Sequence, residues 1–294
     1  DQHIIIEDGV IKPAYTQDAW REGLRYLHKL CSEELLAPIS YTQDFTQQRT
    51  MVNNEGDCIV GAFQYFSQNL CATTSPYYND YFIIAALTGP EGVQYAQYAR
   101  SYPTPQWLVT ADCKYPELAV QIADLLYSDT AALMNRFGEE GLHYTLAKEG
   151  DVCCFDDWEA ILMQTNEGID LWSQVQNNYW RYKAPGVYNH LLNGYVWNGD
   201  PLNGNWRIGQ GATQYFRYVP ETGTYLPQLL LTEDEAFELA DHKTNVLNYA
   251  NECKVRFITG DLDIEKDWDN YVQTINNMRL DDMISIMQKG LDNL

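Results

Sequence analysis

Apolar residues repeat at helical spacing near both ends of the chain, and this periodicity limits the fold more than any other feature. Over 16–35 they recur every three or four positions, which predicts an amphipathic helix that Thr16 can cap. Thr232 and Glu235 have the spacing of a capping box, so another helix is predicted to start there. The other predicted helices cover 43–54, 116–125 with its continuation 130–137, 264–278 and 281–291.

Short apolar runs lie between these helices. The segments 58–63, 81–87 and 107–110 predict strands, and the mixture of many helices with short strands favours the α/β class. The segment 186–211 is rich in Gly, Asn, Tyr and Trp and has little periodicity. It predicts loops that display aromatic rings, a composition often found at functional surfaces.

The charge balance argues against two classes of partner. The chain has 41 acidic and 19 basic residues, a formal charge of -22, and no basic stretch offsets this locally. DNA and anionic membrane surfaces would be repelled, so we expect neither as a partner, whereas a neutral ligand is compatible. Aromatic residues make up 13% of the chain. Core packing is the default interpretation of any single ring, and a ring-lined cleft for a glycan is the functional alternative.

Motifs for metals, cofactors and catalysis are missing from the sequence. No CxxC pair, metal-spaced histidines, Walker loop, GxGxxG, GxSxG or HExxH occurs, so we predict no metal, no cofactor and no catalytic residue. The acidic segment 260–267 lacks the glycine and glutamate of an EF-hand loop. Asp156, Asp157 and Glu159 could supply the paired carboxylates of a glycoside hydrolase, but a solvated helix start is the preferred interpretation.

Three stretches, in order along the chain, resemble a known family. They are TQDAWREGLRYL at 16–27, then DCKYPE at 112–117 with ADLLYS at 123–128, and finally RFITGDLD at 256–263 with DWDNYV at 267–272. Together they are similar to segments of family 1 extracellular solute-binding proteins of bacterial ABC sugar transporters. The similarity is greatest to the lipoprotein-like subgroup of Gram-positive bacteria.

The resemblance implies a two-lobed periplasmic-binding-protein-like α/β fold of type II, here the carboxyl lobe with part of the amino lobe. The implied segments are 1–104 as the first part of the carboxyl lobe, 105–214 as a return segment of the amino lobe, and 215–294 as the closing helices of the carboxyl lobe. Asp1 corresponds to the middle of a typical member. A signal peptide, a lipobox cysteine and the first half of the amino lobe are therefore expected before it.

The function implied by the resemblance is that of the extracytoplasmic substrate-binding component of an ABC importer. Such a component captures a carbohydrate, here expected to be an oligosaccharide, by hinged lobe closure without catalysis. The expected partners are the carbohydrate and the permease subunits. A lipid anchor in the missing amino-terminal part would hold the protein at the outer face of the cytoplasmic membrane. A glycan-active hydrolase and a ligand-free interaction or adhesion module remain as alternatives.

Ligand sites in such folds combine aromatic rings with a few polar groups. Residues 63–65 follow a predicted strand, where a related sugar-binding protein has a tryptophan in its cleft, and Trp107 falls at the implied lobe crossing. Arg207 could hold a hydroxyl or an acidic sugar with two hydrogen bonds, with a structural salt bridge as the alternative. The candidate ligand-binding residues are Phe63, Gln64, Tyr65, Trp107, Trp197, Trp206 and Arg207.

Trp206 carries the most specific expectation. It is flanked by small and polar residues and lacks apolar neighbours at helical spacing. We therefore expect its ring to lie outside a core and to be partly exposed toward the cleft between the lobes. Trp20 and Trp268, in contrast, lie on predicted helical faces and are expected in the core.

Overall fold

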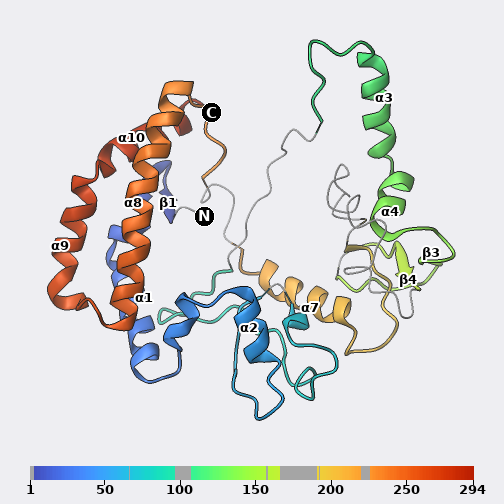
Figure 1. Cartoon of the computed structure of the whole chain (residues 1–294), viewed down its shortest axis with the longest axis horizontal. Coiled ribbons are helices and arrows are strands. Elements are labelled where there is room, and N and C mark those ends of the chain that lie inside the picture. Colours follow the sequence, from blue (N-terminus) through green and yellow to red (C-terminus); the bar gives the residue numbers. More distant parts are fainter. Residues whose placement is uncertain are drawn as a thin grey trace. The chain divides into compact units, whose positions relative to one another are not determined.

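The computed structural model describes residues 3–65, 67–96, 107–156, 158–165, 191, 193–219 and 226–294. The chain divides into two compact units, one made of Asp1–Gln48 with Pro220–Leu294 and the other of Arg49–Val219 (Figure 1). Within the described ranges, no helix has both the length and the apolar character needed to cross a membrane. The lobe assignment of 1–104, 105–214 and 215–294 stays a prediction.

The first unit begins with a hairpin of two antiparallel strands, β1 (Ile4–Glu7) and β2 (Val10–Pro13). Asp8 and Gly9 join the strands with φ angles of 51° and 79°. A two-residue turn with both φ angles positive matches the right-handed twist of the strands, and Asp-Gly is one of the sequences that favour it. The hairpin is therefore specified locally.

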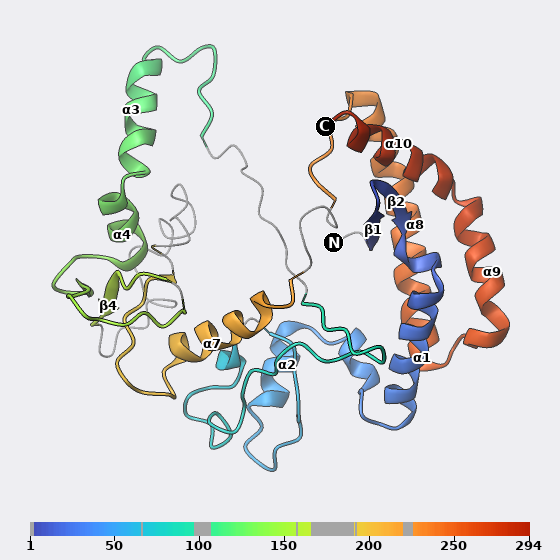
Figure 2. The same cartoon turned by 180° about the vertical axis from the view of Figure 1, so that it is seen from behind.

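Helices follow the hairpin in this unit, with α1 (Asp18–Ser32) and α10 (Leu280–Asp292) packed against α8 (Glu233–Thr259) (Figures 1 and 2). Helix α9 (Ile264–Asn277) contacts α1, α8 and α10. Two short 3-10 turns, η1 (Ala14–Thr16) and η2 (Pro38–Tyr41), flank α1. The buried side chains of the common core include Tyr15, Leu24, Val246, Phe257, Trp268, Tyr271, Ile275 and Met287.

The sequence predictions for these helices are confirmed, apart from one cap. The capping box exists: the Glu235 amide donates to Thr232 Oγ1 at 3.3 Å, and the Thr232 amide donates to the Glu235 carboxylate at 2.9 Å. Trp268 is a core residue with 5% exposure, and Trp20 packs partly buried against the same core. Thr16 does not cap α1, because its hydroxyl faces the Pro13 carbonyl, at 3.5 Å.

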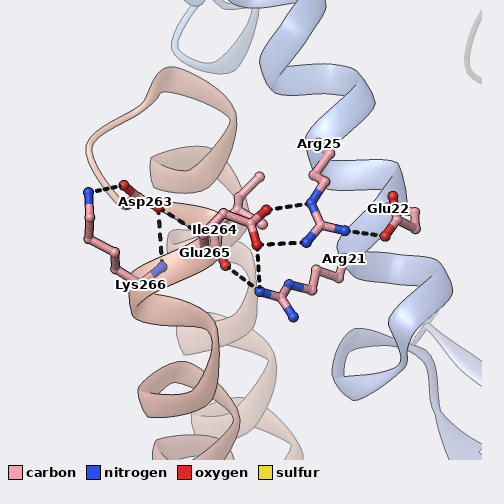
Figure 3. Close-up of polar contacts among 7 residues, drawn as sticks. All are labelled: Arg21, Glu22, Arg25, Asp263, Ile264, Glu265 and Lys266. Carbon is pink, nitrogen blue, oxygen red and sulfur yellow. Dashed lines mark hydrogen bonds and ion pairs between the residues drawn. The ribbon is translucent and has the colours of Figure 1, made fainter.

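Charged side chains fasten the start of α9 to α1 (Figure 3). Arg25 donates from Nε and Nη2 to the two carboxylate oxygens of Glu265 at 2.6 and 2.9 Å. Arg21 donates to the Ile264 carbonyl and to Glu265, both at 3.1 Å. The hydrogen bond from Arg25 lowers the pKa of Glu265. Asp263 accepts from the amides of Glu265 and Lys266, as a helix cap does.

The second unit contains shorter elements. They are the end of α2 (Phe45–Val52), η3 (Gln68–Leu70), α3 (Pro116–Leu126), α4 (Asp129–Phe137), β3 (Tyr144–Leu146), β4 (Leu162–Gln164) and α7 (Gly204–Phe216). Strands β3 and β4 pair antiparallel. The helices predicted at 43–54, 116–125 and 130–137 are confirmed, although Ser128 caps α4 as a separate helix. Gly138 ends α4 with φ 99°, as expected for a glycine at that position.

The described buried residues of the second unit gather in three small clusters. One lies around α4, β3 and β4 and includes Phe137 and Leu162. A second joins Val52 of α2 to Leu70 and Tyr78, and the third is centred on residues 153–155. Several large apolar side chains remain on the surface of α3. Leu118, Ile122 and Leu125 of that helix are 54%, 44% and 65% exposed.

The strands predicted at 58–63, 81–87 and 107–110 are wrong, since the described residues there form no strand. Their apolar side chains are largely exposed, with Ile59 at 60%, Phe82 at 75% and Leu108 at 82%. A strand is stable only when a neighbour completes its hydrogen-bond ladder, and an apolar run does not supply that neighbour.

The loop prediction for 186–211 is wrong from Gly204 onward, where α7 begins. The Asn203 side chain starts the helix by accepting from the Trp206 amide at 3.0 Å. Residues 186–190 and 192 lie outside the described residues.

Candidate ligand-binding site

Helix α7 carries two of the predicted site residues, Trp206 and Arg207. Two glycines let it pack very closely on its neighbours. A Cβ at Gly209 would lie 2.1 Å from the Cys154 carbonyl oxygen, and one at Gly211 would lie 2.5 Å from the Ile83 side chain. The glycines that suggested loops are therefore contact points of a helix, because only a residue without a side chain fits there.

Trp206 and Trp197 form a stacked pair on one side of α7. Their ring centres lie 4.1 Å apart with an angle of 15° between the planes. The Trp197 indole nitrogen donates to the Asp200 carbonyl at 3.1 Å. Both rings are half-buried against the cluster at 153–155. The expectation that Trp206 is partly exposed is confirmed, but the expectation that its ring lies outside a core is wrong, because Trp206 lies in α7 and packs against this cluster. Its direction toward a cleft stays a prediction.

Arg207 points to a different set of partners. It donates to the Tyr78 carbonyl at 3.4 Å and to the Tyr81 carbonyl, and its guanidinium carbon lies 5.7 Å from the centre of the Tyr78 ring. These bonds fix the segment from Tyr78 to Tyr81 against α7. The salt bridge considered for Arg207 does not appear among these contacts, and its bond to a ligand stays a prediction.

Phe63 joins the same group of rings. It meets Tyr81 edge to face with ring centres 4.9 Å apart. The Tyr81 hydroxyl donates to the Val60 carbonyl at 2.6 Å. Burial, with a smaller contribution from the Cys58 thiol at 3.4 Å, raises the pKa of Tyr81, so this hydroxyl stays protonated at neutral pH. Phe63 therefore contacts the ring of Tyr81, and Arg207 contacts its carbonyl, although Phe63 and Arg207 are 144 positions apart (207 − 63).

The remaining candidates lie on the surface. Gln64 is exposed next to Phe63, and Tyr65 is 38% exposed. Trp107 is 40% exposed, at a position that belongs to no helix or strand. The structure thus connects Phe63 and Arg207 through Tyr81 and pairs Trp197 with Trp206, while the roles of all seven candidates in binding stay predictions.

Three polar residues near the start of α7 were missed by the sequence analysis: Gln68, Asn69 and Tyr78. A Cβ at Gly204 would lie 3.8 Å from a polar atom of each of them. Ser67, which accepts from the Asn69 amide at 3.2 Å, marks a local turn in the sequence. Nothing in the sequence connects that turn with Tyr78 or with α7, because both contacts are tertiary.

Carboxylates and thiols are further side chains with chemical potential near these residues. Asp156 accepts from Gln210 Nε2 at 3.3 Å, whereas Asp157 lies outside the described residues, so the hydrolase pair stays untested. Burial raises the pKa of the Cys154 thiol to about 12, which leaves it protonated. All seven cysteines are free. In the part of the chain that the structure describes, no group of His, Cys, Asp and Glu is arranged to hold a metal ion.

No protein-family model matches the chain, and no curated protein matches it in sequence. Several solved structures share its fold over almost the whole chain, and three of them are described below. An HMO-binding, ABC-transporter-associated solute-binding protein from Bifidobacterium longum infantis matches 99% of it, with TM-score 0.66 and 16% identity. The S. pneumoniae ABC-transporter substrate-binding protein FusA, an EF-hand mutant in complex with fructo-nystose, matches 100% with TM-score 0.63 and 16% identity.

The third structure is the alginate-binding protein AlgQ2 without calcium ion, which matches 98% of the chain with TM-score 0.56 and 19% identity. In each comparison the match covers 57% of the other protein, so the chain spans a little over half the length of these structures. The chain therefore has the fold of part of an ABC-transporter solute-binding protein. The α/β fold predicted from the resemblance is confirmed.

Proposed function

We propose that the protein is the substrate-binding component of an ABC importer and that it captures an oligosaccharide without altering it. One observation carries this proposal: the fold is shared over 98–100% of the chain with three proteins whose names tie them to an HMO, to fructo-nystose and to alginate. All three are binding proteins, which supports capture rather than catalysis. The hydrolase and the adhesion module remain as alternatives, and no contact among the described residues favours either of them.

The aromatic candidates would supply the apolar surface of the binding site. Sugar rings have apolar faces that pack on aromatic side chains, and Trp206 and Trp197 are half-buried, with part of each side chain exposed. Phe63, Tyr65 and Trp107 are the other proposed rings, and Gln64 and Arg207 the proposed polar contacts. Hinged closure of two lobes would then enclose the ligand.

The proposed setting follows from this role. An importer's binding component works outside the cytoplasm and delivers its ligand to permease subunits. We propose attachment to the outer face of the cytoplasmic membrane through a lipid anchor. The formal charge of -22 argues against nucleic acid as the partner and is compatible with a neutral small-molecule ligand.

A thermal-shift panel tests the proposal. Kestose, fructo-nystose, an HMO and alginate oligosaccharides are added to this chain and, in parallel, to the natural protein that contains it. A sugar at 100 times its Kd should stabilise the folded state by about 2.7 kcal/mol and raise the Tm. Mass spectrometry should recover that sugar unchanged. A cleaved sugar would establish the hydrolase instead, and no shift with any sugar would overturn the proposal for this panel.

A further inference from the structure

Three polar side chains next to the first turn of α7 form a chain of hydrogen bonds. Gln68 Nε2 donates to the Tyr78 hydroxyl at 3.4 Å, and this hydroxyl donates to Asn69 Oδ1 at 3.1 Å. Since a Cβ at Gly204 would lie 3.8 Å from all three groups, the chain lies directly against α7.

The inner end of this hydrogen-bond chain is deeply buried. Gln68 is 3% exposed, and its Oε1 has no hydrogen-bond partner among the residues that the structure describes. A buried acceptor without a partner costs about 1–3 kcal/mol. An apolar residue at this position would avoid that cost. The glutamine is explained by the hydrogen bond that its Nε2 donates to the Tyr78 hydroxyl.

Tyr78 is held from two further directions. Arg207 donates to its carbonyl, and the guanidinium lies over its ring. Tyr78 itself is 9% exposed within the cluster that includes Leu70. Its single hydroxyl proton therefore has a fixed direction, toward Asn69.

This arrangement determines the orientation of the Asn69 amide. Oδ1 accepts from Tyr78, so the two N–H donors of Nδ2 point away from it. Asn69 is exposed, and Nδ2 has no protein partner within the described residues. An uncharged pair of donors, exposed and held in one direction, suits the oxygen atoms of a polyol.

We propose that Asn69 is a ligand-binding residue that donates from Nδ2 to a carbohydrate oxygen, and that Gln68 and Tyr78 are positioning residues for it. This inference rests on the proposed function, because it assigns a hydroxyl-binding residue to the same site. The Asn69 amide would discriminate between sugars that have an oxygen atom opposite Nδ2 and sugars that lack one.

The test compares Asn69→Ala with Asn69→Asp. Aspartate keeps an oxygen that accepts from Tyr78 but lacks the Nδ2 donors, so both variants should bind the best sugar of the panel about three- to tenfold more weakly. If Asn69 were only structural, Asn69→Asp would restore wild-type affinity. Tyr78→Phe should also weaken binding, while Tyr77→Phe, which removes a neighbouring hydroxyl bonded to the Gly56 carbonyl at 2.7 Å, should not.

An NMR titration with kestose, fructo-nystose, the HMO and the alginate oligosaccharides separates the possible failures. The side-chain amide signals of Asn69 should shift in the same titration as the indole N–H of Trp206. If Trp206 shifts and the Asn69 amide does not, this inference is wrong while the proposed function stands. If no sugar shifts any signal, the proposed function is overturned for this panel, and the inference with it.

Discussion

The two units bury their apolar side chains in different ways. The first gathers residues from the hairpin, α1 and α8–α10 into one core cluster, although these elements come from opposite ends of the chain. In the second unit, the buried residues that the structure describes are distributed over three small clusters, and much of α3 is exposed. The proposed site residues lie in the second unit. Binding surfaces are commonly drawn from less densely packed regions, because such regions can adapt to a ligand.

Core truncation should give the largest contrast between the units. Phe257 is fully buried in the core of the first unit, and Phe137 is 2% exposed in a small cluster of the second. Phe257→Ala should lower the free energy of unfolding by about 3–5 kcal/mol, and Phe137→Ala by about 3 kcal/mol or less, since a small cluster collapses more easily around a cavity. Chemical denaturation followed by amide hydrogen exchange measures both effects.

Hydrogen exchange also shows where each effect lies. Phe257→Ala should accelerate exchange in α8–α10, and Phe137→Ala in α4 and β3. If Phe257→Ala accelerates exchange equally in α4 and α7, the two units unfold together and the comparison between them is wrong.

Two glycine substitutions should change stability in opposite directions. Gly209→Ala places a Cβ 2.1 Å from the Cys154 carbonyl oxygen, so the helix must shift and the second unit should lose about 1–3 kcal/mol. Gly23 lies in α1, where a Cβ meets nothing within 4 Å. Gly23→Ala should stabilise the first unit by about 0.5–1 kcal/mol. Thermal denaturation of both variants checks this, and a neutral Gly209→Ala would contradict the close packing of α7.

The difference between the units also explains what could be predicted from the sequence. Helices such as α8–α10 are specified by local signals, namely the Thr232 capping box and apolar residues at helical spacing. The segment at 81–87 has strand-like composition, but whether it pairs depends on a distant neighbour that no local pattern encodes. Helix α7 was missed because its glycines serve tertiary contacts.

The candidate site shows the same limit. Rings and an arginine in a glycine-rich region could be selected from composition, and the structure does stack Trp197 on Trp206. The contact between Arg207 and the Tyr78 backbone could not be anticipated, since it joins residues 129 positions apart. The sequence therefore indicated the kind of side chain at the site but not the hydrogen-bond partners.

Trp206→Ala tests the proposed site in the second unit. Loss of the ring should weaken binding of the best panel sugar by about 1–3 kcal/mol, the scale of one large apolar contact. The Tm without ligand should fall as well, because the ring stacks on Trp197. Affinity per folded molecule, measured by calorimetry, separates the two effects. Trp206→Phe keeps an aromatic face and should recover part of the affinity; unchanged affinity in Trp206→Ala would remove Trp206 from the site.

The smallest expected effect is a pH dependence that belongs to the first unit. Hydrogen bonds from Lys289 and from the Thr232 amide and hydroxyl lower the pKa of Glu235 from 4.5 to about 2. A carboxylate with a lowered pKa stabilises the folded state above its unfolded pKa, and this contribution is lost as the pH falls through the folded pKa. Glu235→Gln should therefore destabilise α8 and α10 at neutral pH, with the difference from wild type disappearing between pH 4.5 and about 2.

Glu233→Gln is the matched control, because Glu233 lies in the same first turn of α8 but outside the capping box. It removes the same charge near the helix start while leaving the bonds among Thr232, Glu235 and Lys289 intact. Its effect on stability should be smaller than that of Glu235→Gln. The measurement is the midpoint of urea unfolding from pH 7 down to pH 2. If the two variants respond to pH alike, the pH-dependent stability comes from negative charge near the helix start in general. The capping box would then add nothing specific.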